Sequence, residues 1–543
     1  MNPETPSASA PGPADVDVVV VGAGIAGLYA LHRFRGSGLS VRVFEAGEGV
    51  GGVWYWNRYP GARCDVESVD YSYSFDDALQ QDWEWSEKYA TQPEILAYLE
   101  HVADRYDLRR DITFGTRVTD IALDERTLRW HVTTDTGLAV VARFVVLATG
   151  PLSNANTPAI DGLDTFAGRV LHTSHWPHEG VDLTGQRVGV IGTGSSGIQT
   201  IPCLAEQARQ LHVFQRTANY SVPAGNTPLS AADRAAQKAD YAERRRRSMA
   251  SGGGSPHQAH PESALAVSAE ELRDAYEKRW ALGGVLFSKT FPDQLVNLAA
   301  NDTARRFWED KVRAVIDDPR VAELLIPRDH PIGTKRICTD TNYYQTYNRD
   351  NVTLVDLKTT PITRIDATGV HTTDAHHPLD TLVLATGFDA MTGSVARMNI
   401  VGRGGETLNE AWREGPKTYL GLGMTGFPNL FVLTGPGSPS VLANMVLHSE
   451  LHVDWVAEAI AHLDSRGAVA LEARPDAVAD WVRECAQRAA GTLMTQANSW
   501  YLGANIPGRP RVFMPFVGGF GVYGEIIAEV AAAGYQGFDV LEG

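Results

Sequence analysis

Cysteine is scarce in this 543-residue chain, and the few cysteines are not placed for redox or metal chemistry. The four lie far apart and form no Cys-x-x-Cys motif: Cys64, Cys203, Cys338 and Cys485. This spacing is typical of a reducing compartment, and it excludes a disulfide relay and a zinc finger. We therefore expect a cytoplasmic protein that holds no metal ion.

Basic charge and long apolar runs are scarce too. The chain has 48 Lys and Arg against 65 Asp and Glu, and this net charge of −17 argues against nucleic acid and anionic membranes as partners. No run of about 18 apolar residues is present, so we expect no transmembrane helix. The N-terminal "MNPETPSASAPGPADVD" lacks the basic and apolar regions of a signal peptide, and we interpret it as a disordered lead-in.

Glycine, by contrast, is abundant and marks two nucleotide loops. In "VDVVVVGAGIAGLYALHRF" a β-branched run breaks at Gly22, Gly24 and Gly27 and continues as a helical pattern. Strand, tight turn and helix form the context in which GxGxxG places a pyrophosphate at a helix N-terminus. The next strand ends at Glu45, whose carboxylate suits ribose hydroxyls. This unit predicts a dinucleotide site without separating FAD from NAD(H).

The second loop, "GQRVGVIGTGSSGIQTIPCLA", repeats the pattern at Gly192, Gly194 and Gly197. Its following strand ends at Arg216 and Thr217, where the first unit has an acid. An acid would repel a 2′-phosphate, whereas an arginine and a hydroxyl would hold one. The second unit therefore predicts an NADPH site.

Two further apolar strands close on Ala-Thr-Gly, at Gly150 and Gly387. Each resembles the segment by which flavoproteins with two dinucleotide domains pass the chain between their FAD and NADPH domains. We predict an α/β fold with two Rossmann-like domains, the second inserted in the first, and a helical insertion. The expected ranges are 1–150 and 387–543 for the FAD-binding domain, 151–222 and 333–386 for the NADPH-binding domain, and 223–332 for the helical insertion.

The block "FAGRVLHTSHWP" precedes the second loop and looks too mixed for a strand. Its pattern, Phe166-x-Gly168-x3-His172-x3-Trp176, resembles the fingerprint of Baeyer–Villiger monooxygenases. Related heteroatom-oxidising flavoproteins carry Tyr or Phe at the last position, so Trp176 favours the ketone-oxidising group. We expect His172 and Trp176 to anchor the linker into the NADPH domain, and we do not expect His172 to act as an acid or base.

Two more segments extend the resemblance over nearly the whole chain. "GTKRICTDTNYYQTYNRDNV" is similar to the family stretch that carries a catalytic arginine, here Arg336. "GGVWYWNRYPGARCD" matches another family motif through Gly51, Gly52, Trp54, Tyr59, Pro60, Gly61 and Asp65. The resemblance is strongest to the steroid and phenylacetone monooxygenase branch. It implies FAD, NADPH and O₂, and oxidation of a steroid 20-ketone, aryl ketone or cyclic ketone to an ester or lactone through a flavin C4a-peroxide.

The same resemblance implies roles for individual residues. Arg336 supplies a fixed positive charge at the reacting oxygens, and Asp65 is its counter-charge. Beside Glu45 and the first loop, the expected FAD contacts are Gly52, Val53, Trp54, Asp65, Tyr71, Val118 and Met445. Beside the second loop, the expected NADPH contacts are Ser195, Ser196, Gln199, Arg216, Thr217, Lys335 and Trp500. Leu442 and Met445 are expected to line the substrate pocket.

Two other functions stay open. The nearest alternative is a flavin-containing N- or S-monooxygenase. A redox-inactive dinucleotide sensor belongs to another class, and it would not consume NADPH in air. For the oxygenase, we expect a monomer whose partners are a small ketone and O₂.

Residues 223–332 have helical patterns without chemistry of their own. "NDTARRFWEDKVRAVI" predicts a helix that starts at the Asn301-Asp302 cap and sets Trp308, Val312 and Ile316 on one face. The run Arg244–Arg247 predicts a solvated helix face.

Overall fold

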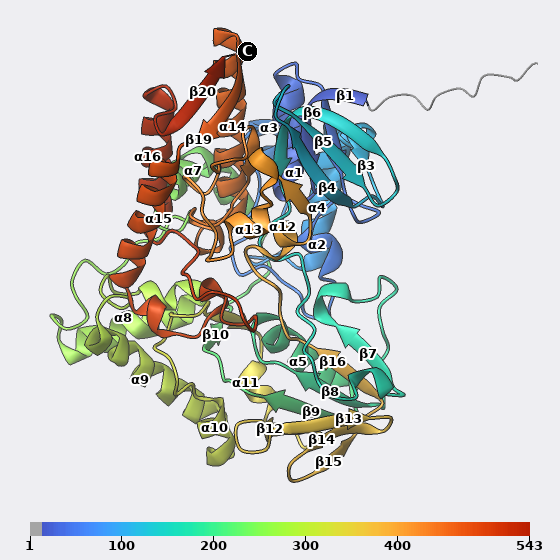
Figure 1. Cartoon of the computed structure of the whole chain (residues 1–543). Helices are drawn as coiled ribbons and strands as arrows, with labels where there is room; N and C mark the ends of the chain where they lie inside the picture. The colour runs from blue at the N-terminus through green and yellow to red at the C-terminus, as the bar shows by residue number, and fades with distance from the viewer. Residues whose placement is uncertain (1–13, 543) are drawn as a thin grey trace, which may run out of the picture.

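The computed structural model describes residues 14–542, which form an α/β fold around two sheets (Figure 1). Residues 1–13 of the expected lead-in lie outside this range, and its last four residues begin the first strand, β1 (Ala14–Val21). No helix within the described range is both long and apolar enough to cross a membrane.

The first sheet is built around β1, where Val18, Val19 and Val20 are fully buried. A continuous β-branched run of this kind fits a strand that is covered on both faces. β1 pairs in parallel with β2 (Val41–Phe44) and β6 (Ala139–Leu147). The strand order is β17-β4-β5-β6-β1-β2-β3, with β18 beside β6. Its other strands are β3 (Ile112–Thr113), β4 (Val118–Asp124), β5 (Arg129–Thr134), β17 (Asn399–Val401) and β18 (Leu430–Val432).

The second sheet is parallel throughout, in the order β12-β9-β8-β16-β7. Its strands are β7 (Arg169–His172), β8 (Arg187–Ile191), β9 (Gln210–Gln215), β12 (Val352–Asp356) and β16 (Thr381–Leu384). The expectation that the block at 166–177 contains no strand is wrong, because β7 pairs with β16 at the sheet edge. Each sheet carries one glycine loop, so the predicted fold class is confirmed.

Each glycine loop joins a strand to a helix. The first loop leads from β1 to α1 (Ile25–Gly36), and the second leads from β8 to α5 (Ser195–Gln207). A helical region lies between β9 and β12, as expected for 223–332. Its helices are α6 (Ala231–Ala239), α7 (Tyr241–Ala250), α8 (Ala269–Leu282), α9 (Leu298–Val315) and α10 (Pro319–Leu325). We keep the name helical insertion for residues 223–332; the domain boundaries themselves stay predictions.

The predicted start of α9 at Asn301 is wrong. The side chain of Asn297 accepts hydrogen bonds from the N–H groups of Ala299 and Ala300, so the helix begins four residues earlier. Asn301 is instead fully buried inside the helix, where it donates to the carbonyl of Gln294. Trp308 and Val312 of α9 lie in one buried cluster as expected, together with Ile316, which directly follows the helix end.

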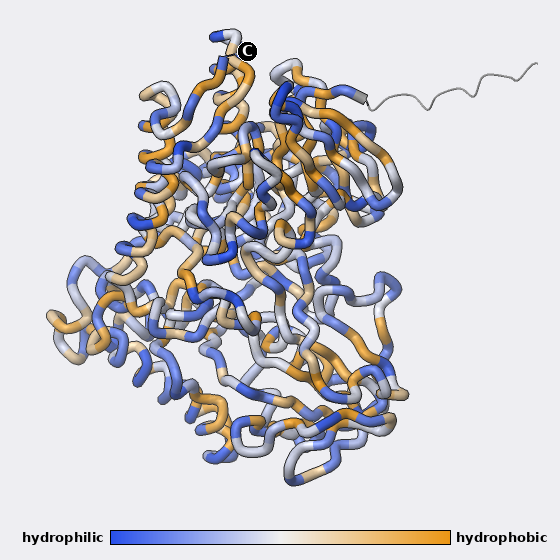
Figure 2. The backbone as a smooth tube through the Cα atoms, viewed as in Figure 1, coloured by the Kyte–Doolittle hydropathy of each residue, from blue (hydrophilic) through white to orange (hydrophobic). Residues whose placement is uncertain are grey.

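The C-terminal helices pack beside the first sheet, where α14 (Met445–Arg466) lies against α1 (Figure 1). Tyr29 and Arg33 of α1 both bond Asp454 of α14. The remaining elements are α2 (Val53–Trp56), α3 (Asp77–Asp82), α4 (Gln92–Arg105), α11 (Tyr343–Thr346), α12 (Gly393–Ala396), α13 (Leu408–Ala411), α15 (Pro475–Ala490), α16 (Phe520–Ala532), β10 (Ser221–Pro223), β11 (Cys338–Asp340), β13 (Ile362–Asp366), β14 (Gly369–Thr372), β15 (His376–Pro378), β19 (Ala468–Ala473) and β20 (Phe538–Glu542). Figure 2 shows hydrophobic residues following the strands of both sheets.

Candidate active site

The glycine loops bring backbone segments closer together than side chains would allow. A Cβ on Gly24 would lie 3.3 Å from the Cα of Gly52, and a Cβ on Gly52 would lie 2.9 Å from the Cα of Gly24, so two backbone segments cross here. A Cβ on Gly27 would lie 1.8 Å from the carbonyl oxygen of Gly22, which explains the close packing of α1 on β1. At Gly194 no atom lies within 4 Å of an added Cβ. This open helix start fits a pyrophosphate.

Several side chains expected at FAD already form hydrogen bonds within the protein. Glu45 accepts hydrogen bonds from the N–H groups of Ala23 and Gly47, both at 2.7 Å. Burial raises the pKa of Glu45. The indole of Trp54 donates to the hydroxyl of Tyr71 at 3.2 Å. The FAD contacts expected of these residues stay predictions, as do those of Val53 at the start of α2 and Val118 at the start of β4.

Arg336 and Asp65 lie 271 positions apart in the chain and form a two-pronged ion pair. The Arg336 Nε donates to one carboxylate oxygen at 2.9 Å, and its Nη2 donates to the other at 2.8 Å. The Arg336 Nη1 donates to the carbonyl oxygen of Val441 at 3.1 Å. Burial disfavours the charged guanidinium, but the Asp65 carboxylate outweighs it and raises the pKa of Arg336 further. The arrangement fixes a permanent cation at this place.

The segment 440–445, which we name the substrate turn, passes directly by Arg336. It consists of a short 3₁₀ turn (Ser440–Leu442) and the start of α14. Leu442, Met445 and Trp500 all pack on one apolar cluster that includes Val441 and Tyr501. The structure therefore gathers the expected substrate and loop residues beside the guanidinium, and their contacts with ligands stay predictions.

Gln199 of α5 joins the two halves of the site. Its Oε1 accepts a hydrogen bond from the Tyr59 hydroxyl at 2.8 Å, and its Nε2 donates to the Arg63 carbonyl at 3.0 Å. A Cβ on Gly61 would lie 2.4 Å from the Gln199 carbonyl oxygen, so a glycine is required there. Ser195 and Ser196, expected at NADPH, form the first turn of the same helix.

Three cations gather at the end of β9, where the 2′-phosphate is expected. Burial lowers the pKa of Lys335 most, Asp329 opposes this shift, and the charges of Arg216 and Lys358 lower the pKa further. Thr217 accepts a hydrogen bond from Thr193 at its carbonyl. A positive group of this kind fits a phosphate dianion. Sequence reasoning missed Lys358, although it lies two residues beyond the end of β12.

The fingerprint residues tie the linker to the second sheet. A Cβ on Gly168 would lie 2.5 Å from the carbonyl oxygen of Asp380, so no other residue fits without displacement. His172 Nε2 lies 3.3 Å from the hydroxyl of Thr386, in the second Ala-Thr-Gly segment. Burial lowers the pKa of His172. Phe166 and Trp176 are buried in apolar clusters on either side. These contacts agree with the expected anchoring role.

The arginine run on α7 is partly buried, so the prediction of a solvated face is wrong for two of its members. Arg245 donates to the carbonyls of Asp70 and Ser72 at 3.0 and 2.9 Å. Arg244 forms two hydrogen bonds with the Asp70 carboxylate. Through these hydrogen bonds, the helical insertion holds the segment that follows Asp65 in place. Arg246 is exposed and pairs with the nearby Glu243, as the prediction had it.

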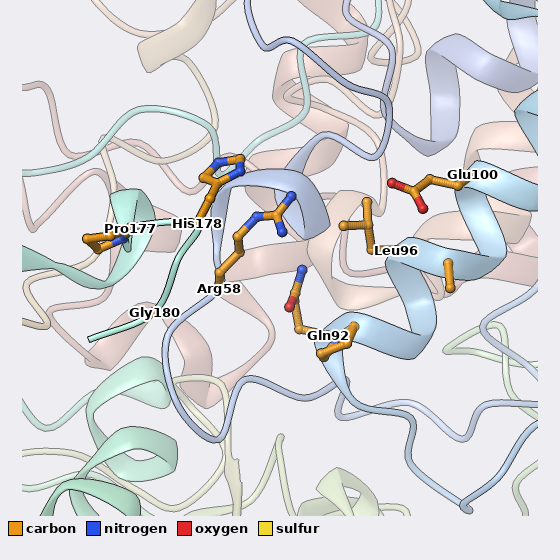
Figure 3. Close-up of a pocket in the computed structure, with 9 residues that line it drawn as sticks. Arg58, Gln92, Leu96, Glu100, Pro177, His178 and Gly180 are labelled. Carbon is orange, nitrogen blue, oxygen red and sulfur yellow. The ribbon is translucent and has the colours of Figure 1, made fainter. Parts of the chain in front are cut away.

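A surface pocket of about 270 Å³ lies between α4 and the residues after the fingerprint (Figure 3). Arg58 and His178 border one side, and Gln92 and Leu96 of α4 border the other. The pocket shares no lining residue with the Arg336–Asp65 pair.

Asp366, His371 and His376 lie together on the small sheet β13-β14-β15, with one ligand atom of each within 4.8 Å of the others. The Asp366 carboxylate already bonds His371 Nε2. The expectation that the protein holds no metal stays a prediction.

The comparisons with known proteins agree with this geometry. Residues 19–231 match a family described as pyridine nucleotide-disulphide oxidoreductase. A Baeyer–Villiger monooxygenase of Pseudooceanicola batsensis is 43% identical over 539 residues, which are 98% of this chain and 98% of that protein. A phenazine N-monooxygenase of Lysobacter antibioticus is 42% identical over 531 residues, which are 96% of each.

Solved structures extend the likeness to three dimensions. The structure of an oxidised steroid monooxygenase bound to NADP is 72% identical, with a TM-score of 0.94 over 98% of this chain and 100% of that one. Identity at this level over the whole length confirms the resemblance and the expected cofactors. The chain therefore belongs to the family of FAD- and NADPH-dependent Baeyer–Villiger monooxygenases.

Proposed function

We propose that this enzyme oxidises steroid 20-ketones and related ketones to esters, with aryl and cyclic ketones as further substrates. The balanced reaction joins ketone, O₂, NADPH and a proton to give ester, water and NADP⁺. The observation that carries the proposal is the Arg336–Asp65 pair beside the substrate turn. The 72% identity with a steroid monooxygenase supports the steroid assignment.

Arg336 stabilises the negative charge that develops on oxygen when the ketone carbonyl is attacked. Of the roughly five N–H donors of a guanidinium, Asp65 and Val441 take three. The others stay available to the reacting oxygens. Because these donors are fixed before the reaction, they stabilise the transition state without reorganisation. Asp65 acts as a positioning residue, since it holds the guanidinium in one orientation.

The residues present fit both dinucleotides. The crossing of Gly24 with Gly52 and the open start of α5 at Gly194 are backbone approaches that phosphates need. Bound FAD supplies the redox chemistry, because it accepts a hydride from NADPH and delivers one oxygen atom of O₂. Arg216, Lys335 and Lys358 supply the positive charge that selects NADPH.

Oxidation of nitrogen or sulfur is the second candidate. The 42% identity with a phenazine N-monooxygenase favours it. Trp176 and the Arg336–Asp65 pair favour the ketone reaction, which needs a cation at the carbonyl oxygen.

Product mass spectrometry separates the two. Purified yellow enzyme is mixed with NADPH, air and a panel of progesterone, phenylacetone, cyclohexanone, a thioether and phenazine. We expect an ester or lactone one oxygen heavier than its ketone, with the steroid turned over at the lowest concentration. Sulfoxide or N-oxide without any ester would favour the second candidate. NADPH that is not consumed in air would indicate a sensor.

We also propose a monomer, which light scattering of the FAD-bound enzyme tests. Several exposed large apolar side chains in the described residues stand singly on separate elements, among them Val53, Leu138 and Val170, whereas the four most exposed, Leu265, Leu282, Val296 and Leu298, belong to the helical insertion. Singly exposed apolar residues do not need a partner.

A further inference from the structure

Lys289 ends a 3₁₀ turn (Val285–Lys289) of the helical insertion, and its ammonium has no counter-charge among the described residues. Burial and the nearby charge of Arg336 both lower the pKa of Lys289, and no carboxylate or acceptor of residues 14–542 raises it. Two other lysines of the helical insertion do have acidic partners. Lys278 pairs with Asp274, and Lys311 pairs with Glu277.

The Lys289 side chain is only partly exposed, so its ammonium keeps some water but lacks a protein partner. An ammonium that loses part of its hydration without gaining a partner is destabilised, and the group carries three donors that need acceptors. Such groups persist mainly where function retains them. The missing acceptor is therefore expected to arrive with a ligand.

Lys289 lies beside the substrate turn, and this position indicates the kind of ligand that it meets. A Cβ on Gly253 would lie 3.5 Å from the Lys289 Nζ and 4.0 Å from the Leu442 carbonyl oxygen, so both atoms border the same small space. The N–H of Asn444 donates to the Gly253 carbonyl at 2.9 Å, which holds this loop on the substrate turn. Arg336 bonds the preceding residue of the turn, Val441. Two cations therefore border the substrate turn, and Asp65 neutralises the first.

The phosphates of NADPH are the competing ligand. Arg216, Lys335 and Lys358 already gather at the end of β9, and the start of α5 is open for the pyrophosphate. Of the three cations, none is among the charges that shift the pKa of Lys289, whereas Arg336 is. The segment beside Lys289 is instead the substrate turn, whose residues Leu442 and Met445 are expected to line the substrate pocket.

We propose that Lys289 binds a second oxygen of the substrate, remote from the ketone that reacts. The preferred substrates are then ketones that carry another carbonyl, hydroxyl or carboxylate oxygen, rather than plain hydrocarbon ketones. The Lys289 Nζ donates a hydrogen bond to this oxygen, while Arg336 serves the reacting carbonyl. This inference rests on the proposed function and names the substrate class of the same site.

The test compares Lys289→Met with wild type on matched substrate pairs. One pair is a steroid 20-ketone with and without an oxo group on the far ring. The others are methyl ketones of increasing length that end in a carboxylate or in a methyl group. We expect Lys289→Met to raise KM at least tenfold for the best oxygen-bearing member and less than twofold for its partner, with kcat nearly unchanged. Lys289→Arg should restore most of the difference, and Lys278→Met is the matched control.

Three results would overturn the inference. One is an equal change for both members of every pair, which indicates a structural role. Another is a rise in the KM for NADPH, which indicates a phosphate ligand. The third is no change at all. If wild type forms no ester from any ketone, the proposed function fails instead. Binding of the same pairs to the oxidised enzyme, followed by flavin absorbance, then still reports on Lys289.

Discussion

Substitutions of Arg336 and of its ion-pair partner Asp65 are expected to lower activity to different extents. In the proposed mechanism, removing Arg336 takes away the positive charge at the reacting oxygens, whereas Asp65→Asn removes only the carboxylate that orients the guanidinium. We expect Arg336→Met to lower kcat for ester formation about 10²–10³-fold, because fixed donors to a developing oxyanion have effects of that size. Asp65→Asn should lower kcat less, by about tenfold, since the pair is partly open and its charges are screened.

Steady-state ester formation is the measurement, and flavin absorbance is the control for bound FAD. An Arg336→Met enzyme that keeps its FAD and forms ester within tenfold of wild type would contradict the role of the guanidinium.

A second residue-scale prediction concerns the choice of nicotinamide. Lys335 and Arg216 lie in a group of like charges that repel one another until a phosphate neutralises them. Lys335→Met and Arg216→Met should each raise the KM for NADPH about tenfold and leave the KM for NADH within twofold. Kinetics with both cofactors at low and moderate salt test this, with Lys278→Met as the control. Equal effects on the two cofactors would place these side chains elsewhere than at the 2′-phosphate.

At the scale of elements, α7 sets the shape of the segment after Asp65. Arg245 is buried and bonds two backbone carbonyls, while Arg246 on the next position is exposed. We expect Arg245→Met to lower the free energy of unfolding by about 2–4 kcal/mol, because it leaves the buried Ser72 carbonyl without this donor and the Asp70 carbonyl with Asn444 alone. Arg246→Met should change it by less than about 0.5 kcal/mol.

The same pair tests positioning. If α7 holds the segment between Asp65 and Tyr71 in place, Arg245→Met should also lower kcat and change the circular dichroism of the bound flavin. Thermal unfolding, kinetics and the flavin spectrum are compared with those of Arg246→Met. Identical results for the two variants would show that the hydrogen bonds of Arg245 do not position the active site.

Local patterns predicted the elements whose causes are local. Strand, glycine loop and helix follow each other within some twenty residues in both nucleotide units, so their signals are contained in one stretch of sequence. The start of α9 was misplaced because two asparagines compete as caps, and only tertiary packing buries Asn301. The strand β7 was missed since its partner β16 lies about two hundred positions away.

The site was predicted by resemblance more than by pattern. Nothing in "ERRRRS" distinguishes Arg245 from Arg246, because the difference depends on how α7 meets a segment far earlier in the chain. The same holds for the Arg336–Asp65 pair, which only the motif comparison suggested. Lys289 gave no signal at all, since its isolation is a property of the folded chain.

At the scale of the whole molecule, the chain passes between the two sheets twice, after β6 and after β16. His172, the last residue of β7, lies at the end of the first passage and meets Thr386 of the second passage by a hydrogen bond. Thr386 in turn donates to the carbonyl of Asn156 in the first passage. The passages are therefore one connected unit, and a movement of either sheet carries both.

This connection predicts that His172 acts on domain closure and not on chemistry. Because burial lowers the pKa of His172, its imidazole is neutral at neutral pH and serves as a hydrogen-bond partner. We expect NADP⁺ to draw the two sheets together, which small-angle scattering measures as compaction. His172→Ala and Thr386→Val should each reduce this compaction and lower ester formation per NADPH consumed about tenfold. The double variant should be little worse than Thr386→Val alone, since both substitutions remove the bond between His172 and Thr386, and Thr386→Val also removes the bond to Asn156. Loss of activity in His172→Ala with normal NADPH binding and normal compaction would instead assign the imidazole a direct part in the reaction.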